Sequence, residues 1–171
     1  MLPIPDDTAS PNGLHDICGP LLPLVGVWRA EGEVDYPTID GPHRFGQQLV
    51  ISHDGRPFLH HDARAWLLDE AGEVIRPAAR ETGWWRPQPD GRIELLLTHA
   101  TGLLELFYGT AGEAEWELST ETVLRSASAK DVNAARRRYS LRPDGRLTYT
   151  EHRAMMGRPM TLHVSSVLER S

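Results

Sequence analysis

The stretch GVWRAEGEVDYPTI, residues 26–39, alternates between two sets of positions with a period of two residues. One set is mostly charged, and the other carries Trp28, Ala30 and Gly32. This period is typical of a β-strand with one solvated face and one buried face. The buried face has small side chains at its middle, where Leu or Ile would fill an ordinary core. The pattern therefore predicts a strand that leaves room on its inner side for something other than protein.

Turn signals recur at short intervals along the rest of the chain. Asp-Gly pairs, which supply the positive φ angles of tight hairpins, occur at residues 54–55, 90–91 and 144–145. Between the turns lie segments with the length and composition of strands. These segments are residues 25–36, 43–52, 57–68, 73–86, 91–99, 103–109, 114–121, 131–141, 146–154 and 160–169. The sequence thus predicts ten antiparallel strands joined as a meander.

Ten short antiparallel strands must protect the edges of their sheet, and closure into an up-and-down barrel removes these edges. A barrel of this size is wide enough to hold a small ligand. We therefore predict an all-β fold, a ten-stranded antiparallel up-and-down β-barrel formed by a single domain, residues 1–171. The segment GLHDICGPLLPLVG, residues 13–26, permits only a short N-terminal helical turn, because its prolines prevent a longer helix. Residues 1–13 are expected to form a flexible tail.

The composition of the chain limits which partners it can bind and which cellular compartment it fits. The formal net charge of −6 argues against a general binder of nucleic acid or of anionic membranes. The N-terminal sequence MLPIPDDTASPNG has neither a basic region nor an apolar run, so we predict no secretion signal and no membrane span. The single cysteine, Cys18, fits a reducing compartment, and we expect a cytoplasmic protein.

The common catalytic signatures are absent from the sequence, which has no Gly-rich phosphate loop, no GxSxG, no HExxH and no CxxC. Adjacent His60 and His61, followed by Asp62, suggest metal binding or acid–base chemistry. On a strand, however, neighbouring side chains point to opposite faces, so at most one of the two histidines enters the barrel.

His163 differs from the other histidines because apolar and small neutral residues surround it in the last predicted strand, PMTLHVSSVLE. Such surroundings favour the neutral imidazole, which is the form that a metal ligand requires. A structural zinc site needs four ligands, whereas a heme iron can take a single axial histidine. From the residues alone, His163 is either a core histidine or an axial heme ligand.

The opening stretch resembles the nitrobindin family of small heme-binding β-barrels, whose N-terminal strand has the pattern GxWxGxGxGxYPTI. The matching positions are Gly26, Trp28, Gly32 and residues 36–39. Ala30 and Val34 replace two of the glycines, which would narrow the pocket. The resemblance continues in order through DGRPFL, ETGWWRPQPDGRIEL, ATGLLEL, AKDVNAARRRYSL and RPMTLH. It therefore covers nearly the whole chain beyond the N-terminal tail.

This resemblance implies one heme b per chain, with His163 as the axial ligand of the iron. Lys130, the only lysine, matches a family position near the heme edge, where an ammonium group would pair with a propionate. The signature strand is expected to contribute further heme contacts, from Trp28, Ala30, Gly32 and Thr38.

The distal side of the expected heme is left open by the sequence. A family member carries Met and His at the positions that match Ala78 and Ala79. It carries another Met where the alignment gives either His152 or Arg153. The register of the penultimate strand therefore decides which of these two side chains enters the barrel.

The resemblance also implies the activity, that of a peroxynitrite isomerase. Its ferric heme would bind nitric oxide and isomerise peroxynitrite to nitrate, in detoxification or in sensing. The expected partners are these small molecules, with no nucleic acid and no membrane. A homodimer is compatible with the sequence, although strand alternation alone singles out no dimer patch. The alternative function is that of a lipocalin-like or fatty-acid-binding-like carrier of an apolar small ligand, which would not depend on His163.

Overall fold

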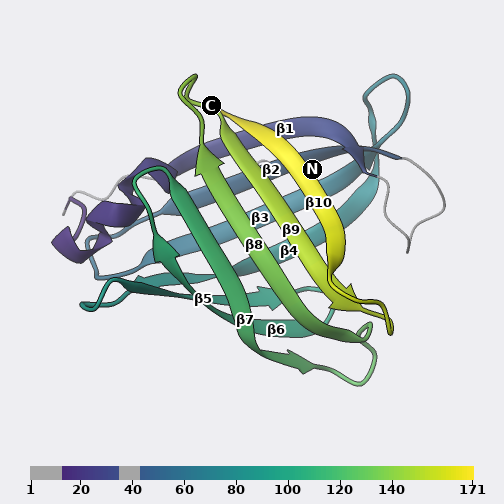
Figure 1. Cartoon of the computed structure of the whole chain (residues 1–171). Helices are drawn as coiled ribbons and strands as arrows, with labels where there is room; N and C mark the ends of the chain where they lie inside the picture. The colour runs from purple at the N-terminus through teal and green to yellow at the C-terminus, as the bar shows by residue number, and fades with distance from the viewer. Residues whose placement is uncertain (1–12, 35–42) are drawn as a thin grey trace.

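The computed structural model describes residues 13–34 and 43–171, and its strands close into an antiparallel barrel (Figure 1). The elements are the 3₁₀-helix η1 (Asp16–Leu24) and the strands β1 (Gly26–Val34), β2 (His43–Ser52), β3 (Leu59–Leu68), β4 (Val74–Pro87), β5 (Arg92–His99), β6 (Leu103–Ala111), β7 (Glu115–Arg125), β8 (Val132–Leu141), β9 (Leu147–Met155) and β10 (Thr161–Arg170). Each strand pairs with its sequence neighbours, and β10 pairs with β1. The predicted ten-stranded barrel with a short N-terminal helical turn is confirmed. Within the described residues, no helix has the length and apolarity to cross a membrane.

Two of the hairpins are formed by the same Asp-Gly-Arg turn. The carboxylate of Asp90 accepts a hydrogen bond from the backbone N–H of Arg92 at 3.1 Å, and Asp144 does the same in the β8–β9 turn. The glycine at the centre of each turn, Gly91 in one and Gly145 in the other, has a φ angle of 84° or 82° respectively. Side chains disfavour this left-handed region, so these Asp-Gly pairs specify where the chain reverses.

Helix η1 covers one end of the barrel, where two tryptophans hold it against the core (Figure 1). The indole N–H of Trp28 donates to the carbonyl of Leu24 at 2.8 Å, and that of Trp116 donates to the carbonyl of Pro20 at 3.0 Å. Leu21 and Leu24 of the helix itself are fully buried. This end of the barrel is therefore filled by protein.

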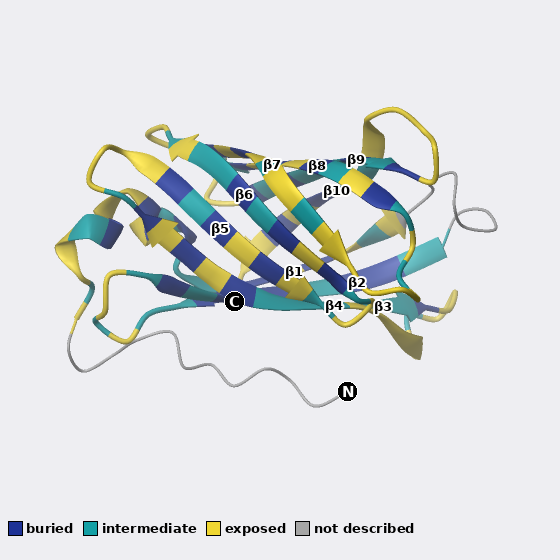
Figure 2. Ribbon diagram, turned by 90° about the horizontal axis from the view of Figure 1, so that it is seen from below, coloured by how far each residue is buried: buried dark blue, intermediate teal, exposed yellow. Residues whose placement is uncertain are grey.

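Strand β1 shows the alternation that the sequence predicts, as does the barrel wall generally (Figure 2). Trp28 and Ala30 are buried. The exposed charged positions are Arg29, Glu31 and Glu33. Val27 is the exception on the outer face, because it is buried against Val50, its partner across the β1–β2 ladder.

Two ladders of the barrel are short, and both stop before the end away from η1. In the described residues, the β1–β10 ladder consists of the pairs Trp28 with Arg170 and Arg29 with Glu169. The β7–β8 ladder covers only residues 115–119 of β7. Beyond it, the hydroxyl of Thr120 binds both the N–H and the carbonyl of Ala135. Both ladders thus lie at the η1 end, and beyond these pairs the described residues of β1 with β10, and of β7 with β8, form no further ladder.

Candidate functional site

His163 occupies a β-bulge in β10. Leu162 pairs with His152 and Val164 pairs with Glu151, so His163 is an extra residue in the ladder. A bulge re-aims side chains relative to a regular strand. Leu162 is exposed, whereas His163 is half-buried and within reach of the charges inside the barrel. The bulge therefore places the imidazole at the inner face of the barrel, near the end away from η1.

The surroundings of His163 favour its neutral form. Burial lowers the pKa of the imidazole, because the charged form would lose solvation. The carboxylate of Glu151 raises this pKa, and the positive charges of Arg153, Arg137 and Lys130 lower it. The result is a pKa below the ordinary value, which favours the neutral imidazole, the form that a metal ligand requires. Lys130 is exposed in the β7–β8 turn, and its charge acts at this same end.

The small side chain of Ala30 allows two neighbouring strands to meet across β1. The hydroxyl of Ser166 on β10 donates to the amide oxygen of Gln47 on β2 at 3.0 Å. Gln47 is the cross-strand partner of Ala30, so this hydrogen bond passes over the alanine. A larger residue at position 30 would occupy the same space on the inner face.

The other predicted heme contacts are distributed along β1 and beyond it. A Cβ on Gly32 would lie 3.2 Å from the ring of Phe45, so this ring occupies part of the space over the glycine. Trp28 lies in the core beneath η1, where its indole binds Leu24. Thr38 lies outside the described residues. The assignment of these residues to a heme pocket stays a prediction.

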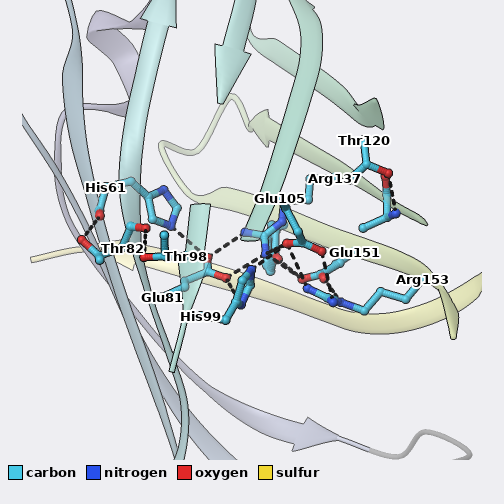
Figure 3. A network of polar contacts seen from close by, with 12 residues as sticks. His61, Glu81, Thr82, Thr98, His99, Glu105, Thr120, Arg137, Glu151 and Arg153 are labelled. Atoms are coloured by element: carbon cyan, nitrogen blue, oxygen red, sulfur yellow. Dashed lines mark hydrogen bonds and ion pairs between the residues drawn. The ribbon is translucent and has the colours of Figure 1, made fainter. Parts of the chain in front are cut away.

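A network of charged side chains fills the middle of the barrel, with Arg137 at its centre (Figure 3). The guanidinium of Arg137 donates two hydrogen bonds of 2.7 Å to the two oxygens of Glu81. A second carboxylate, that of Glu151, lies 3.4 Å from Arg137. Bidentate pairing of this kind fixes the planes of both groups, so Arg137 is held rigidly in the interior.

Arg153 and His99 extend this network toward β5 and β6. Arg153 pairs with Glu151 and lies 3.2 Å from an oxygen of Glu105. The Nε2 of His99 lies 2.6 Å from Glu105, and its Nδ1 lies 3.4 Å from Glu81. Each arginine and each carboxylate of this network thus has a partner of opposite charge inside the barrel, and His99 lies between two of the carboxylates.

The two adjacent histidines of β3 lie on opposite faces, as predicted. His61 is buried, and its Nδ1 accepts a hydrogen bond from the indole of Trp85 at 3.2 Å. Its Nε2 therefore carries the proton and donates to Glu81 at 2.9 Å, which makes this imidazole neutral. Burial lowers the pKa of His61 in agreement with this tautomer. His60 lies outside, with its ring 4.9 Å from that of Trp84. In the described residues, no three potential ligands gather as a metal site.

The structure also settles which side chain of β9 points inward. Arg153 is buried in the network, whereas His152 lies on the outer face beside Leu162. Ala78 and Ala79 lie on the exposed first half of β4. Neither alanine offers a hydrogen-bonding side chain.

Sequence reasoning missed the interior network, although one signal was present. In β8 and β9, charged residues alternate in phase with aromatic and aliphatic residues that belong to the core. Arg137 shares its face with Ala135 and Tyr139, and Glu151 shares its face with Leu147 and Tyr149. Charged residues in phase with core positions predict buried ion pairs.

Acid is expected to weaken the fold by protonating this network. Burial raises the pKa of Glu151, but the charges of Arg137 and Arg153 outweigh burial and lower it to about 2. Because this value lies below that of the unfolded chain, about 4.3, the pairing stabilises the fold above pH 4.3 and is lost as pH falls toward 2. Glu151→Gln should flatten the fall of the urea midpoint across this window. The exposed control Glu70→Gln should retain the wild-type slope, and equal slopes for all three proteins would contradict the assignment.

Comparisons with known proteins agree with the barrel fold. The family model described as "THAP4-like, heme-binding beta-barrel domain" matches residues 17–170. A Nocardioides sp. protein named peroxynitrite isomerase is 48% identical over 160 residues, which cover 94% of this chain and 96% of the relative. A Saccharopolyspora erythraea protein named ferric nitrobindin-like protein is 46% identical over 159 residues, covering 92% and 74%. The crystal structure of Rv2717c from M. tuberculosis is similar with a TM-score of 0.81 and 34% identity, covering 92% of this chain and 99% of that one.

Proposed function

Because this chain belongs to the THAP4-like, heme-binding β-barrel family, with nitrobindin-like relatives, we propose that it is a peroxynitrite isomerase that binds one heme b through His163. Its ferric form would convert peroxynitrite to nitrate and bind nitric oxide in the cytoplasm. The observation that carries the proposal is the position of His163, a neutral imidazole that a β-bulge turns toward the inner face of the barrel.

The residues around His163 fit a heme. Leu103, Val132 and Met155 form a separate apolar cluster on β6, β8 and β9, at the end away from η1. Lys130, in the turn before β8, supplies the positive charge that a heme carboxylate requires. An axial nitrogen, apolar contacts and a cation are the groups by which a protein holds a heme.

The side chains have separate tasks in the proposed reaction. When bound, ferric heme supplies a Lewis acid that promotes the isomerisation of peroxynitrite to nitrate, which needs no further reactant. His163 contributes its nitrogen lone pair to the iron, and Lys130 orients the cofactor by its charge. By the family resemblance, Ala78 and Ala79 match positions where a relative carries Met and His, and neither alanine would offer a hydrogen-bonding side chain there.

The interior network argues against the carrier alternative. A barrel that carries fatty acids needs a cation inside to receive the carboxylate of the ligand. Here Arg137 is paired with Glu81 and Glu151, and Arg153 is paired with Glu151 and Glu105. Both interior guanidinium groups already pair with carboxylates of the protein, so a ligand carboxylate would have to compete with these carboxylates.

The proposal is tested by following peroxynitrite decay in stopped flow. The heme-loaded protein is compared with the heme-free chain and with an equal concentration of free ferric heme, and nitrate is measured at the end. The heme-loaded protein should accelerate the decay beyond both controls and increase the yield of nitrate. Decay no faster than with free heme would refute the proposed activity.

Ala30→Leu is expected to lower the affinity for heme about tenfold. The added side chain would occupy the space where Ser166 and Gln47 meet, on the wall proposed to face the pocket. Titration of heme into the protein, followed by the Soret band, measures the change. Ala71→Leu in the exposed β3–β4 turn is the control and should bind heme as the wild type does. Unchanged affinity of Ala30→Leu would remove Ala30 from the pocket.

A further inference from the structure

The hairpin that joins β9 to β10 gathers methionines at one end of the barrel. The sequence contains four methionines, of which Met155, Met156 and Met160 lie in this hairpin and the fourth is Met1. The hairpin lies at the end of the barrel away from η1 and leads directly into the strand that carries His163 (Figure 1). These three thioethers therefore lie at the rim of the site that is proposed to hold the heme.

Two of the three methionines are open to solvent. Met156 and Met160 have exposed fractions of 53% and 40%. Met155 is buried and packs with Leu103 and Val132. A thioether sulfur is polarizable, and an accessible one is readily oxidised to the sulfoxide. Met156 and Met160 are therefore exposed to dissolved oxidants, whereas Met155 belongs to an apolar cluster.

The backbone of the turn does not call for a methionine at position 156. Met156 and Gly157 have φ angles of 52° and 73°, and the N–H of Arg158 donates to the carbonyl of Met155 at 2.9 Å. A hairpin turn with two consecutive positive φ angles favours Asn, Asp or Gly at its first central position. The left-handed region is uncommon for long side chains. Turn geometry therefore does not explain why a methionine stands at this exposed position.

Positive charge borders the two exposed methionines. The N–H of Met156 donates to the carbonyl of Asp131 at 2.7 Å, which joins the hairpin to the β7–β8 turn that carries Lys130. The carboxylate of Asp131 is paired with Arg125 at 2.9 Å, and Arg158 is exposed within the hairpin itself. Lys130 and Arg158 thus provide local positive charge on a chain of net charge −6. Such a local concentration of one sign of charge attracts small ions of the opposite sign.

We propose that Met156 and Met160 form a second site of reaction with peroxynitrite, where each thioether accepts one oxygen atom and becomes methionine sulfoxide. The sulfur lone pair forms a bond to the terminal peroxo oxygen, the O–O bond breaks, and nitrite leaves with the electron pair of that bond. Sulfur is oxidised by two electrons and peroxynitrite is reduced by two, so the step needs no proton and no further reactant. The choice of this oxidant rests on the proposed function, but the product is nitrite instead of nitrate. A reductase of methionine sulfoxide would restore both thioethers.

The site is tested by treating the full chain, with and without heme, with less than one equivalent of peroxynitrite. Mass spectrometry of its peptides then quantifies the sulfoxide at each methionine. The substitution Leu22→Met adds an internal reference, because Leu22 is 54% exposed on η1 at the opposite end. Met156 and Met160 should be oxidised at least about threefold faster than the reference thioether, because the neighbouring cations concentrate the anion. Met155 should remain reduced.

Two controls separate the effect of charge from that of exposure. Hydrogen peroxide also transfers one oxygen atom to a thioether but is uncharged, so the preference for Met156 and Met160 should disappear with it. Arg158→Gln should lower the rate of their oxidation by peroxynitrite about twofold at low salt, and salt at about 1 M should remove the preference in the wild type. The double variant Met156→Leu with Met160→Leu should form less nitrite from the same amount of peroxynitrite.

The proposal would be overturned by equal oxidation of Met156, Met160 and the reference thioether at low salt. A preference that is the same with hydrogen peroxide, or an unchanged nitrite yield in the double variant, would also overturn it. Because the preference is measured in the heme-free chain as well, its failure is distinct from a failure of the proposed isomerase activity.

Discussion

Replacing His163 by glycine is expected to lower the rate of peroxynitrite conversion by the heme-loaded protein more than about 100-fold, the upper range for loss of a group that only supports a metal ligand. The proposed axial ligand is this one imidazole, held at the inner face by the bulge between Leu162 and Val164. Stopped-flow decay of peroxynitrite at matched heme content measures the rate.

Added imidazole distinguishes loss of a ligand from loss of structure. In His163→Gly, free imidazole can enter the vacated space and supply the same nitrogen, so part of the rate should return as its concentration rises. His152→Gly is the control, because His152 lies on the outer face of β9 next to this site. A His163→Gly protein that keeps the wild-type rate, or one that imidazole does not improve, would contradict the assigned role.

Replacing Arg137 by methionine is expected to lower the free energy of unfolding by about 3–5 kcal/mol. This is the range observed when one partner of a buried ion pair is removed and the other charge stays buried. For a chain of this length, the melting temperature should fall by about 10 °C. The variant leaves the carboxylate of Glu81 without its two 2.7 Å hydrogen bonds and removes a positive charge beside Glu151. Thermal unfolding followed by circular dichroism measures the loss.

The neighbouring arginine is a matched control for this variant. Arg138 points outward and pairs with Glu115 at the surface, so Arg138→Met should leave stability almost unchanged. The double variant Arg137→Met with Glu81→Gln should recover part of the loss, because the unpaired buried charge is then absent. If the two arginine variants melt at the same temperature, the interior network does not stabilise the fold as described.

The barrel could be predicted from the sequence because its signals are local. Alternation in β1 indicates one buried face, and the turns at Gly91 and Gly145 require positive φ angles that the Asp-Gly pairs supply. The predicted strand ranges lie within a few residues of those observed. The buried position of Val27 could not be predicted, because it depends on contact with Val50 across the sheet.

The site could be predicted only in part, because its geometry depends on contacts between distant segments. The apolar neighbours of His163 indicate a neutral imidazole, and the structure agrees. The bulge that turns this side chain is not visible in the sequence, since an extra residue in a ladder depends on the register with β9. The pairing of Arg137 with Glu81, which are 56 residues apart, likewise depends on barrel closure.

The most direct test of the account is an absorption titration of heme into the wild type and into His163→Ala, before and after addition of nitric oxide. The account predicts a ferric Soret band in the wild type that saturates at one heme per chain and shifts with nitric oxide. It predicts an altered or absent band in the variant. A wild type that takes up no heme, or a variant with the same spectrum and stoichiometry as the wild type, would contradict it.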